Sequence, residues 1–182
     1  MRHTTPLLTA AVAWALMAGP ALASSMPHAD FSHNTLGLGL GSGIAASADF
    51  PLNRDWMLGV AANLSYFGTF GNFGSSVDVH ALYKILRGTG SAGKLDLDIL
   101  GGVQGFSTTS FDPFIGVALA YPFTPRLTGR LNLALGLPGL FPGGWGVVGP
   151  SGIELGYKFS SRLEGTIGEN GHGDVLGLSY AF

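Results

Sequence analysis

The stretch DVLGLSYAF (Asp174–Phe182) decides the fold that this sequence predicts. Side chains of an extended strand alternate between two faces, so this stretch predicts a strand with one apolar face. That face carries Leu176, Leu178, Tyr180 and Phe182. The opposite face is expected to carry the smaller Val175, Gly177, Ser179 and Ala181. A strand that is apolar on one face and ends on a phenyl ring is not typical of a protein surrounded by water.

Composition narrows the class of protein further. Of the 182 residues, 46% are hydrophobic and only 11% are charged, and thirty are glycine. The length suits one domain. A low-complexity chain is excluded because the apolar residues are abundant and regularly spaced. These properties favour a membrane protein.

The N-terminal segment has the features of a secretory signal peptide. Arg2 supplies a positive charge, Leu7–Met17 is apolar, and Ala21–Ala23 forms an A-x-A cleavage site. The alternative, a membrane anchor, is disfavoured because the apolar stretch is short and no stop-transfer charges follow it. We therefore expect residues 1–23 to be removed and the chain to be exported.

The exported part contains no apolar run of the length, about eighteen residues, that a transmembrane helix requires. A chain with this hydropathy can still cross a bilayer as strands, because only alternate residues need to be apolar. We expect residues 24–33 to form a short lead and residues 34–182 to form the barrel. The sequence has no cysteine, so neither disulfides nor a lipoprotein anchor is expected.

Alternation of apolar and polar residues identifies the strands. Around Asp78, His80 and Lys84, for example, the intervening positions carry apolar residues from Val77 to Ile85. Further segments alternate in the same way, beginning near Trp56, Leu95, Ile115, Leu127, Ile153, Leu163 and Asp174. A helical period explains none of these segments.

The polar faces of these strands predict a charged barrel interior. The expected inward residues are Asp78, His80, Lys84, Lys94, Asp96, Asp98, Arg130, Glu154 and Glu164. Both signs of charge are present, and an unpaired charge there would be costly, so we expect an ion-pair network that largely fills the lumen. The alternative is a narrow, gated polar path, because many of the inward neighbours are only glycine or alanine.

The number of strands depends on Thr35–Phe50. This segment is either one long strand or a hairpin that turns at Gly41–Gly43 and pairs Leu40 with Ile44. Both chain ends are expected at the same side of the membrane, which requires an even number of strands. The sequence therefore predicts an all-β antiparallel transmembrane β-barrel of ten strands, with eight strands as the alternative.

The connections are of two kinds. Those around residues 51–55, 87–94, 123–126 and 160–162 are mostly short and basic, as periplasmic turns are. The other connections are longer and rich in glycine, and we expect Asp112, Glu169 and Asp174 at their rim. Their apolar residues could pack over the barrel mouth or form an exposed rim for lipid or a partner. These residues are Phe70, Phe73, Phe106, Phe111, Leu140, Phe141 and Trp145.

The chain resembles the small outer-membrane β-barrels of Gram-negative bacteria, of the OmpA and OmpX type. The final strand and its terminal aromatic carry this resemblance, and "NTLGLGLGSGIAASADF" followed by "PLNRDW" is similar to the start of YfaZ-like barrels. The resemblance implies a monomer in the outer membrane, in contact with its lipids. It also implies that the barrel-assembly machinery recognises Leu176, Leu178, Tyr180 and Phe182.

Catalytic and metal sites find little support in the sequence. His172 lies near Glu169 and Asp174, and Ser107, Ser110 or Ser151 could approach it, as in an outer-membrane lipid hydrolase. No nucleophile motif accompanies these residues, so we expect His172 to be a solvated loop residue and predict no catalytic residue. Asp78, Asp96 and Asp98 are better explained by ion pairs than by a bound cation, so no metal or cofactor is predicted.

The predicted function is that of an integral outer-membrane barrel with a structural or interaction role at the cell surface. A narrow porin-like channel is the first alternative. A barrel that binds lipid or an apolar solute through its hydrophobic outer loops is the second. Nucleic-acid binding is not expected, because the net charge is −2 and the basic residues are scattered among the turns.

Overall fold

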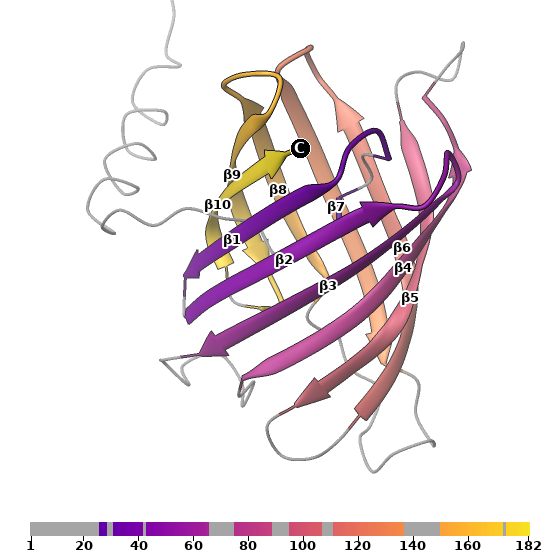
Figure 1. Ribbon diagram of the computed structural model, residues 1–182, viewed down its shortest axis with the longest axis vertical. Helices are drawn as coiled ribbons and strands as arrows, with labels where there is room; N and C mark the ends of the chain where they lie inside the picture. The colour runs from indigo at the N-terminus through magenta and orange to yellow at the C-terminus, as the bar shows by residue number, and fades with distance from the viewer. Residues whose placement is uncertain are drawn as a thin grey trace, which may run out of the picture.

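The computed structural model describes residues 26–28, 31–41, 43–65, 75–88, 95–106, 111–136, 150–172 and 174–182 (Figure 1). Ten strands form a closed barrel in which each strand pairs antiparallel with its neighbour in the sequence and β1 pairs with β10. Their bounds are β1 Thr35–Gly41, β2 Gly43–Pro51, β3 Trp56–Ser65, β4 Ser76–Leu86, β5 Asp96–Phe106, β6 Phe111–Pro122, β7 Leu127–Gly136, β8 Gly152–Lys158, β9 Leu163–Asn170 and β10 Asp174–Ala181. No helix in these ranges is long and apolar enough to cross a membrane.

The first two strands form the hairpin that the even strand number requires. Leu40 of β1 pairs with Ile44 of β2, and the register continues to Thr35 opposite Asp49. The prediction of ten strands is thereby confirmed, and the alternative of eight is wrong.

The seam between β1 and β10 corrects the expected faces of the last strand. Leu40 pairs with Leu176, but Gly41 pairs with Asp174, so the register shifts by one residue. A bulge of this kind reverses the alternation of side chains on one side of it. Asp174 is therefore buried rather than exposed at the rim, and Val175 points outward instead of sharing a face with Gly177.

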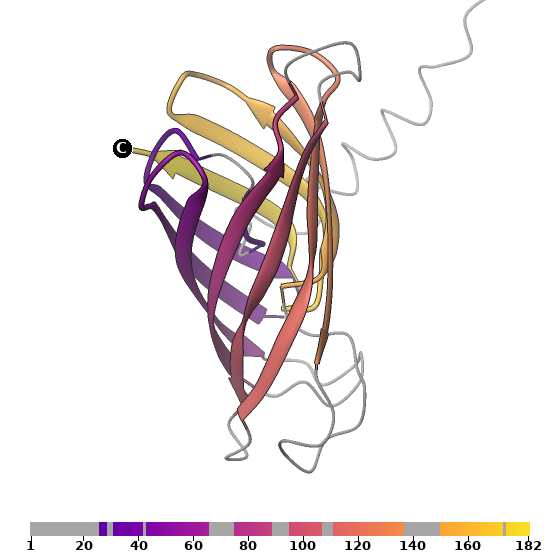
Figure 2. The ribbon, with the colours of Figure 1, turned by 90° about the vertical axis from the view of Figure 1, so that its right-hand side faces the viewer.

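Figure 2 shows the wall of strands from a second side. Large apolar side chains cover the outside of this wall. Val79 and Ile153 are 58% and 62% exposed, whereas the polar residues beside them, Asp78, His80 and Glu154, are buried. The alternation read from the sequence is confirmed in every strand from β2 to β9. It sorts apolar residues to the outside and polar residues to the inside, the reverse of a water-soluble barrel.

We call the end of the barrel with the β2–β3, β4–β5, β6–β7 and β8–β9 connections the turn end, and the opposite end the loop end. The same hydrogen-bonding pattern occurs in the turns at residues 52–55, 123–126 and 159–162. In each turn, one side-chain oxygen accepts hydrogen bonds from two backbone N–H groups. The accepting atoms are Asn53 Oδ1, Thr124 Oγ1 and Ser160 Oγ. The C-terminus also lies at the turn end (Figure 1), where Phe182 N donates to Asn34 O over 3.0 Å.

Pairs of aromatic rings line the outer surface near this end. Ring centroids lie 4.8 Å apart in the Trp56–Tyr83 pair and 5.5 Å apart in the Tyr157–Phe159 pair. Both pairs contain exposed rings at strand termini, the arrangement typical of residues at a membrane–water interface.

Candidate functional site in the barrel interior

The interior of the barrel is lined by buried polar side chains. They include Asp49, Asn63, Ser76, Asp78, His80, Asp98, Gln104, Arg130, Asn132, Glu154, Glu164, Thr166, His172 and Asp174. Buried charges are tolerated when they are paired and hydrogen-bonded. Seven of these residues belong to two separate networks.

Two aspartates and two histidines form the first network, which we call the aspartate–histidine chain. His80 bridges two carboxylates, with Nε2 2.9 Å from Asp49 Oδ1 and Nδ1 2.7 Å from Asp78 Oδ1. The second oxygen of Asp78 lies 2.8 Å from His172 Nε2. The four side chains are 0–3% exposed, so charge on any one of them is stabilised by its neighbours and hardly by solvent.

A glycine on the strand between them allows Asp49 and His80 to meet. In the register, Gly59 of β3 is opposite Asp49 on one side and opposite His80 on the other. A Cβ atom at Gly59 would lie 2.8 Å from His80 Cε1, and closer still to His80 Nε2 and Asp49 Oδ1. The ion pair therefore spans β3 through the space that the missing side chain leaves.

Polar side chains hold the turn that carries His172 against the wall. Asn63 Nδ2 donates to the carbonyl oxygen of His172 over 3.0 Å, and Asn63 Oδ1 accepts from Ser76 N and Oγ over 2.7 Å each. His172 is 2% exposed, so the expectation of a solvated loop histidine is wrong. The reason is that the turn after β9 folds over the interior, where Asp78 attracts the imidazole.

The second network, which we call the arginine cluster, gathers Arg130, Glu154, Glu164 and His28. Arg130 Nη1 donates to Glu154 Oε1 over 3.0 Å and lies 2.6 Å from Glu164 Oε1. His28 Nε2 lies 3.2 Å from the same oxygen of Glu154. Here too a glycine leaves the space, because a Cβ at Gly156 would lie 2.5 Å from Glu164 Oε1 and 2.6 Å from Arg130 Nη1.

Three further predicted interior residues, Lys84, Asp96 and Asp98, lie near the turn end. Lys84 Nζ is 3.7 Å from Asp96 Oδ1 and 4.4 Å from the ring centroid of Phe31. Asp98 is fully buried, and neither of its carboxylate oxygens has a hydrogen-bond partner among the described residues. Lys94 lies outside the described residues.

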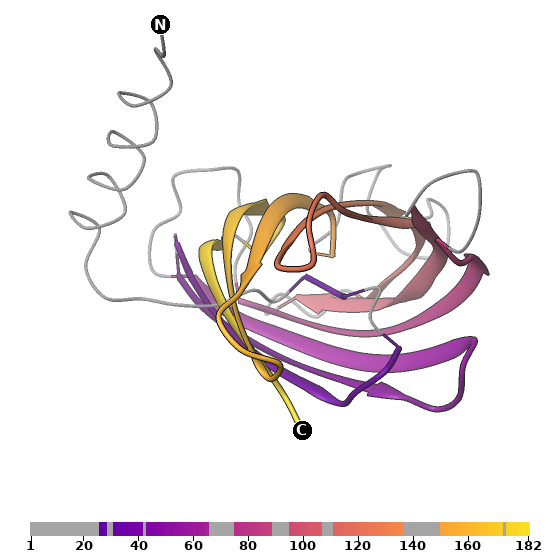
Figure 3. The same ribbon diagram turned by 90° about the horizontal axis from the view of Figure 1, so that it is seen from above.

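A segment that precedes the first strand lies inside the barrel, where the sequence suggests only a lead. Met26 is 1% exposed, and the carbonyl oxygen of Pro27 accepts a 3.0 Å bond from Asn132 Nδ2 of β7. Figure 3 shows this short indigo segment within the ring of strands. Phe31 packs further along on a buried apolar cluster that includes Leu82, Leu100 and Phe114. The segment thus binds the inner wall through both apolar and polar contacts.

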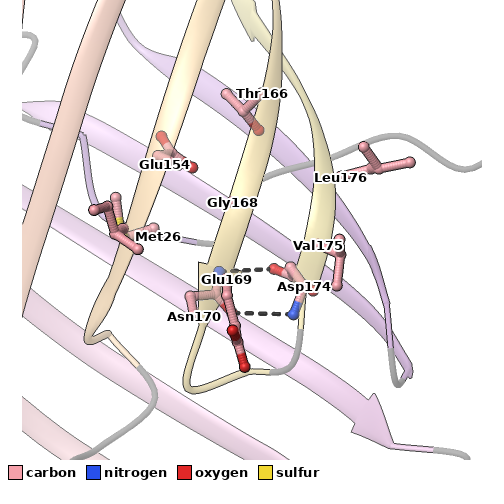
Figure 4. Close-up of a pocket in the computed structure, with 10 residues that line it drawn as sticks. Met26, Glu154, Thr166, Gly168, Glu169, Asn170, Asp174, Val175 and Leu176 are labelled. Carbon is pink, nitrogen blue, oxygen red and sulfur yellow. Dashed lines mark hydrogen bonds between the residues drawn. The ribbon is translucent and has the colours of Figure 1, made fainter. Parts of the chain in front are cut away.

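The lumen is nearly filled beside Met26. Figure 4 shows Met26 next to Glu154 in a small cavity, where Asn170 Nδ2 and Asp174 Oδ2 form a 3.1 Å hydrogen bond. The cavity has a volume of about 10 Å³. A water molecule needs at least about that volume, so there is no room here for a solute.

The candidate catalytic residues that the structure describes, Ser151 and His172, are each engaged with another group. Ser151 Oγ donates to the carbonyl oxygen of Ala134 and accepts from its N–H, at 2.9 and 2.8 Å, while His172 is engaged with Asp78. Ser107 and Ser110 lie outside the described residues. The described residues also contain no group of three or more histidines and carboxylates arranged to hold a metal ion.

The expected apolar rim of outer loops can be followed only in part. Phe111 begins β6 and is 59% exposed. The described residues do not include Phe70, Phe73, Leu140, Phe141 or Trp145. Phe106 ends β5, and only its backbone is described.

Comparison with protein-family models, curated proteins and solved structures gave no match. The functional argument for this chain therefore rests on its own geometry.

Proposed function

We propose that this protein is an integral outer-membrane β-barrel with a structural or interaction role at the cell surface, and that its lumen is closed by its own side chains and N-terminal segment. The observation that carries the proposal is the inverted distribution of side chains in a closed barrel. Exposed leucine, valine and isoleucine cover the outside, and buried aspartate, histidine, arginine and glutamate fill the inside.

Water is a poor environment for such a surface. Soluble monomers rarely expose a continuous apolar patch larger than a few hundred Å². Here the apolar side chains extend around the barrel on every strand, and a closed barrel leaves no unpaired backbone edge to face lipid. The N-terminal charge, apolar stretch and A-x-A site support export, and the short basic turns support a periplasmic turn end.

Insertion by the barrel-assembly machinery is part of the proposal. Tyr180 and Phe182 are 43% and 52% exposed on the outer face of the final strand and are accessible to a recognising protein. We also propose that the protein is a monomer, because β1 and β10 close the barrel within one chain.

The second candidate function is a narrow channel. A cavity of about 580 Å³ enters the barrel from the turn end, so the lumen is open over part of its length. The aspartate–histidine chain, the arginine cluster and the segment at residues 26–28 then separate this cavity from the loop end.

Two measurements test the proposal. The mature chain, residues 24–182, is refolded into lipid vesicles and examined for a heat-modifiable band on gel electrophoresis and for strand structure by circular dichroism. Single-channel recording in planar bilayers follows. A folded, protease-resistant barrel without discrete openings is the expected result. Failure to insert would contradict the membrane assignment, and steady openings would favour the channel.

A further inference from the structure

We propose that the cavity at the turn end binds a small molecule carrying a phosphate group. We call this cavity the basic vestibule. Its volume of about 580 Å³ lies in the range of small-molecule sites. Five cationic side chains and a single carboxylate line it, namely Arg54, Lys84, Arg87, Arg130, Lys158 and Asp96.

The cations reach the vestibule from separate parts of the wall. Arg54 lies in the turn before β3, Lys84 is near the end of β4, Arg87 follows it, and Arg130 and Lys158 come from β7 and β8. An anion in the cavity can therefore be contacted from several directions. That arrangement suits a tetrahedral group with several acceptor oxygens better than a planar carboxylate.

Arg87 pairs with Asp55 and Lys84 with Asp96, so the positive charge available to an anion lies mainly on the other three cations. The partners of Arg130, Glu154 and Glu164, do not line the vestibule. Among the described residues, neither Arg54 nor Lys158 has a carboxylate within 4.0 Å.

A smaller cavity adjoins the vestibule. Its volume is about 100 Å³, and it shares Ser32, Arg130 and Lys158 with the vestibule while adding the cation Arg162 and the carboxylate Glu164. Lys158 lines both cavities, which meet at Ser32. Because Lys158 has no carboxylate within 4.0 Å among the described residues, its ammonium group can contact an anion without breaking an ion pair.

The rest of the lining indicates an organic phosphate rather than a bare ion. Phe31 and Pro122 supply apolar surface, and Ser32 and Thr128 supply hydroxyl groups. Guanidinium groups can bind phosphate oxygens in pairs, and ammonium adds a point charge. The phosphate could belong to a soluble ester or to a lipid headgroup at the inner edge of the membrane.

Calorimetric titration of the refolded chain in micelles of an uncharged detergent tests this inference. The probes are inorganic phosphate, glucose 6-phosphate, glucose and dihexanoyl phosphatidic acid, at low ionic strength. We expect saturable binding of glucose 6-phosphate or of the short-chain lipid, weakening as salt is added, and no binding of glucose. Preference for one of the two identifies the source of the phosphate.

Three variants locate the site. Lys158→Gln and Arg54→Gln are each expected to weaken phosphate binding about tenfold, the effect of one lost charge-assisted contact. Arg126→Gln is the matched control, since Arg126 is a turn-end arginine that lines neither cavity, and it should leave the affinity unchanged. All three residues lie at or near the turns, and the heat-modifiable band shows that each variant is folded.

Absence of saturable binding by every phosphate probe would overturn the inference. Equal weakening by Arg126→Gln would do the same, because it would show general attraction to a basic surface. The titration needs only the folded barrel in detergent, so its outcome is separable from membrane localisation and from conductance.

Discussion

Replacing Gly59 with alanine should break the contact between Asp49 and His80. The added methyl group would lie 2.8 Å from His80 Cε1 and closer to the two atoms that form the ion pair. Those atoms are at the ends of side chains and can rotate away, so the methyl group fits only when the 2.9 Å contact opens. A buried hydrogen bond to a charged group contributes about 1.5–3 kcal/mol, and overpacking costs about 1–3 kcal/mol. We expect the free energy of unfolding to fall by about 2.5–6 kcal/mol in total.

Urea unfolding in lipid vesicles, followed by tryptophan fluorescence, measures this loss. The midpoint should fall while the dependence on urea concentration stays the same, because the surface exposed on unfolding is unchanged. Gly101→Ala is the matched control. A Cβ there meets only the carbonyl oxygen of Phe114, at an ordinary 3.7 Å, so its effect should stay within about 1 kcal/mol.

A chain in which Asp49 and His80 are both replaced by alanine separates the loss of the ion pair from any effect of Gly59→Ala on the backbone. In that chain the methyl group at residue 59 has room, and Gly59→Ala should cost no more free energy of unfolding than Gly101→Ala. If the full cost persists in that background, or if Gly59→Ala is as mild as Gly101→Ala in the wild-type chain, the reasoning is refuted.

Three further predictions concern the arginine cluster and the N-terminal segment. Arg130→Met removes the buried cation that both Glu154 and Glu164 contact, and it should lower the free energy of unfolding by about 3–5 kcal/mol in the same urea assay. Stability should recover in part when both glutamates become glutamine; no recovery would mean that packing rather than charge is lost. The chain has no cysteine, so Met26→Cys introduces a single thiol, which should react with a soluble maleimide only after unfolding; rapid labelling of the folded barrel would place residue 26 outside the lumen. Deleting residues 26–33 should increase ion leakage from vesicles, measured with a trapped dye, whereas unchanged leakage would show that side chains alone close the lumen.

Alternation along the strands was enough to predict the barrel and the residues that face its interior. Asp78, His80, Arg130, Glu154 and Glu164 were all assigned inward from parity, and all are buried. Parity did not decide between one long strand and a hairpin at Gly41–Gly43. The requirement for an even number of strands favoured the hairpin. The inward assignments depend only on which face a side chain occupies, and that is a local property of the sequence.

The partners inside the lumen could not be predicted in the same way. Asp49 meets His80 across a whole strand, and this contact depends on the register that places Gly59 between them. His172 and Met26 lie outside the strands and have no periodicity, so nothing in the pattern shows that they turn inward. The bulge that buries Asp174 arises where β10 meets β1, from a pairing between the two ends of the chain.

The two glycine gaps also bear on how the barrel reaches its native alignment. Gly59 and Gly156 each sit beneath a pair of charged groups from the strands on either side, so each pair can close only when three strands are aligned together. A slip of β3 by one residue would place Leu58 or Val60 in the gap between Asp49 and His80. The slip would both turn an apolar side chain toward the lumen and separate these two charged groups. Backbone hydrogen bonds tolerate such slips, but these pairs do not. The two pairs therefore stabilise the native register of three neighbouring strands relative to a slipped one.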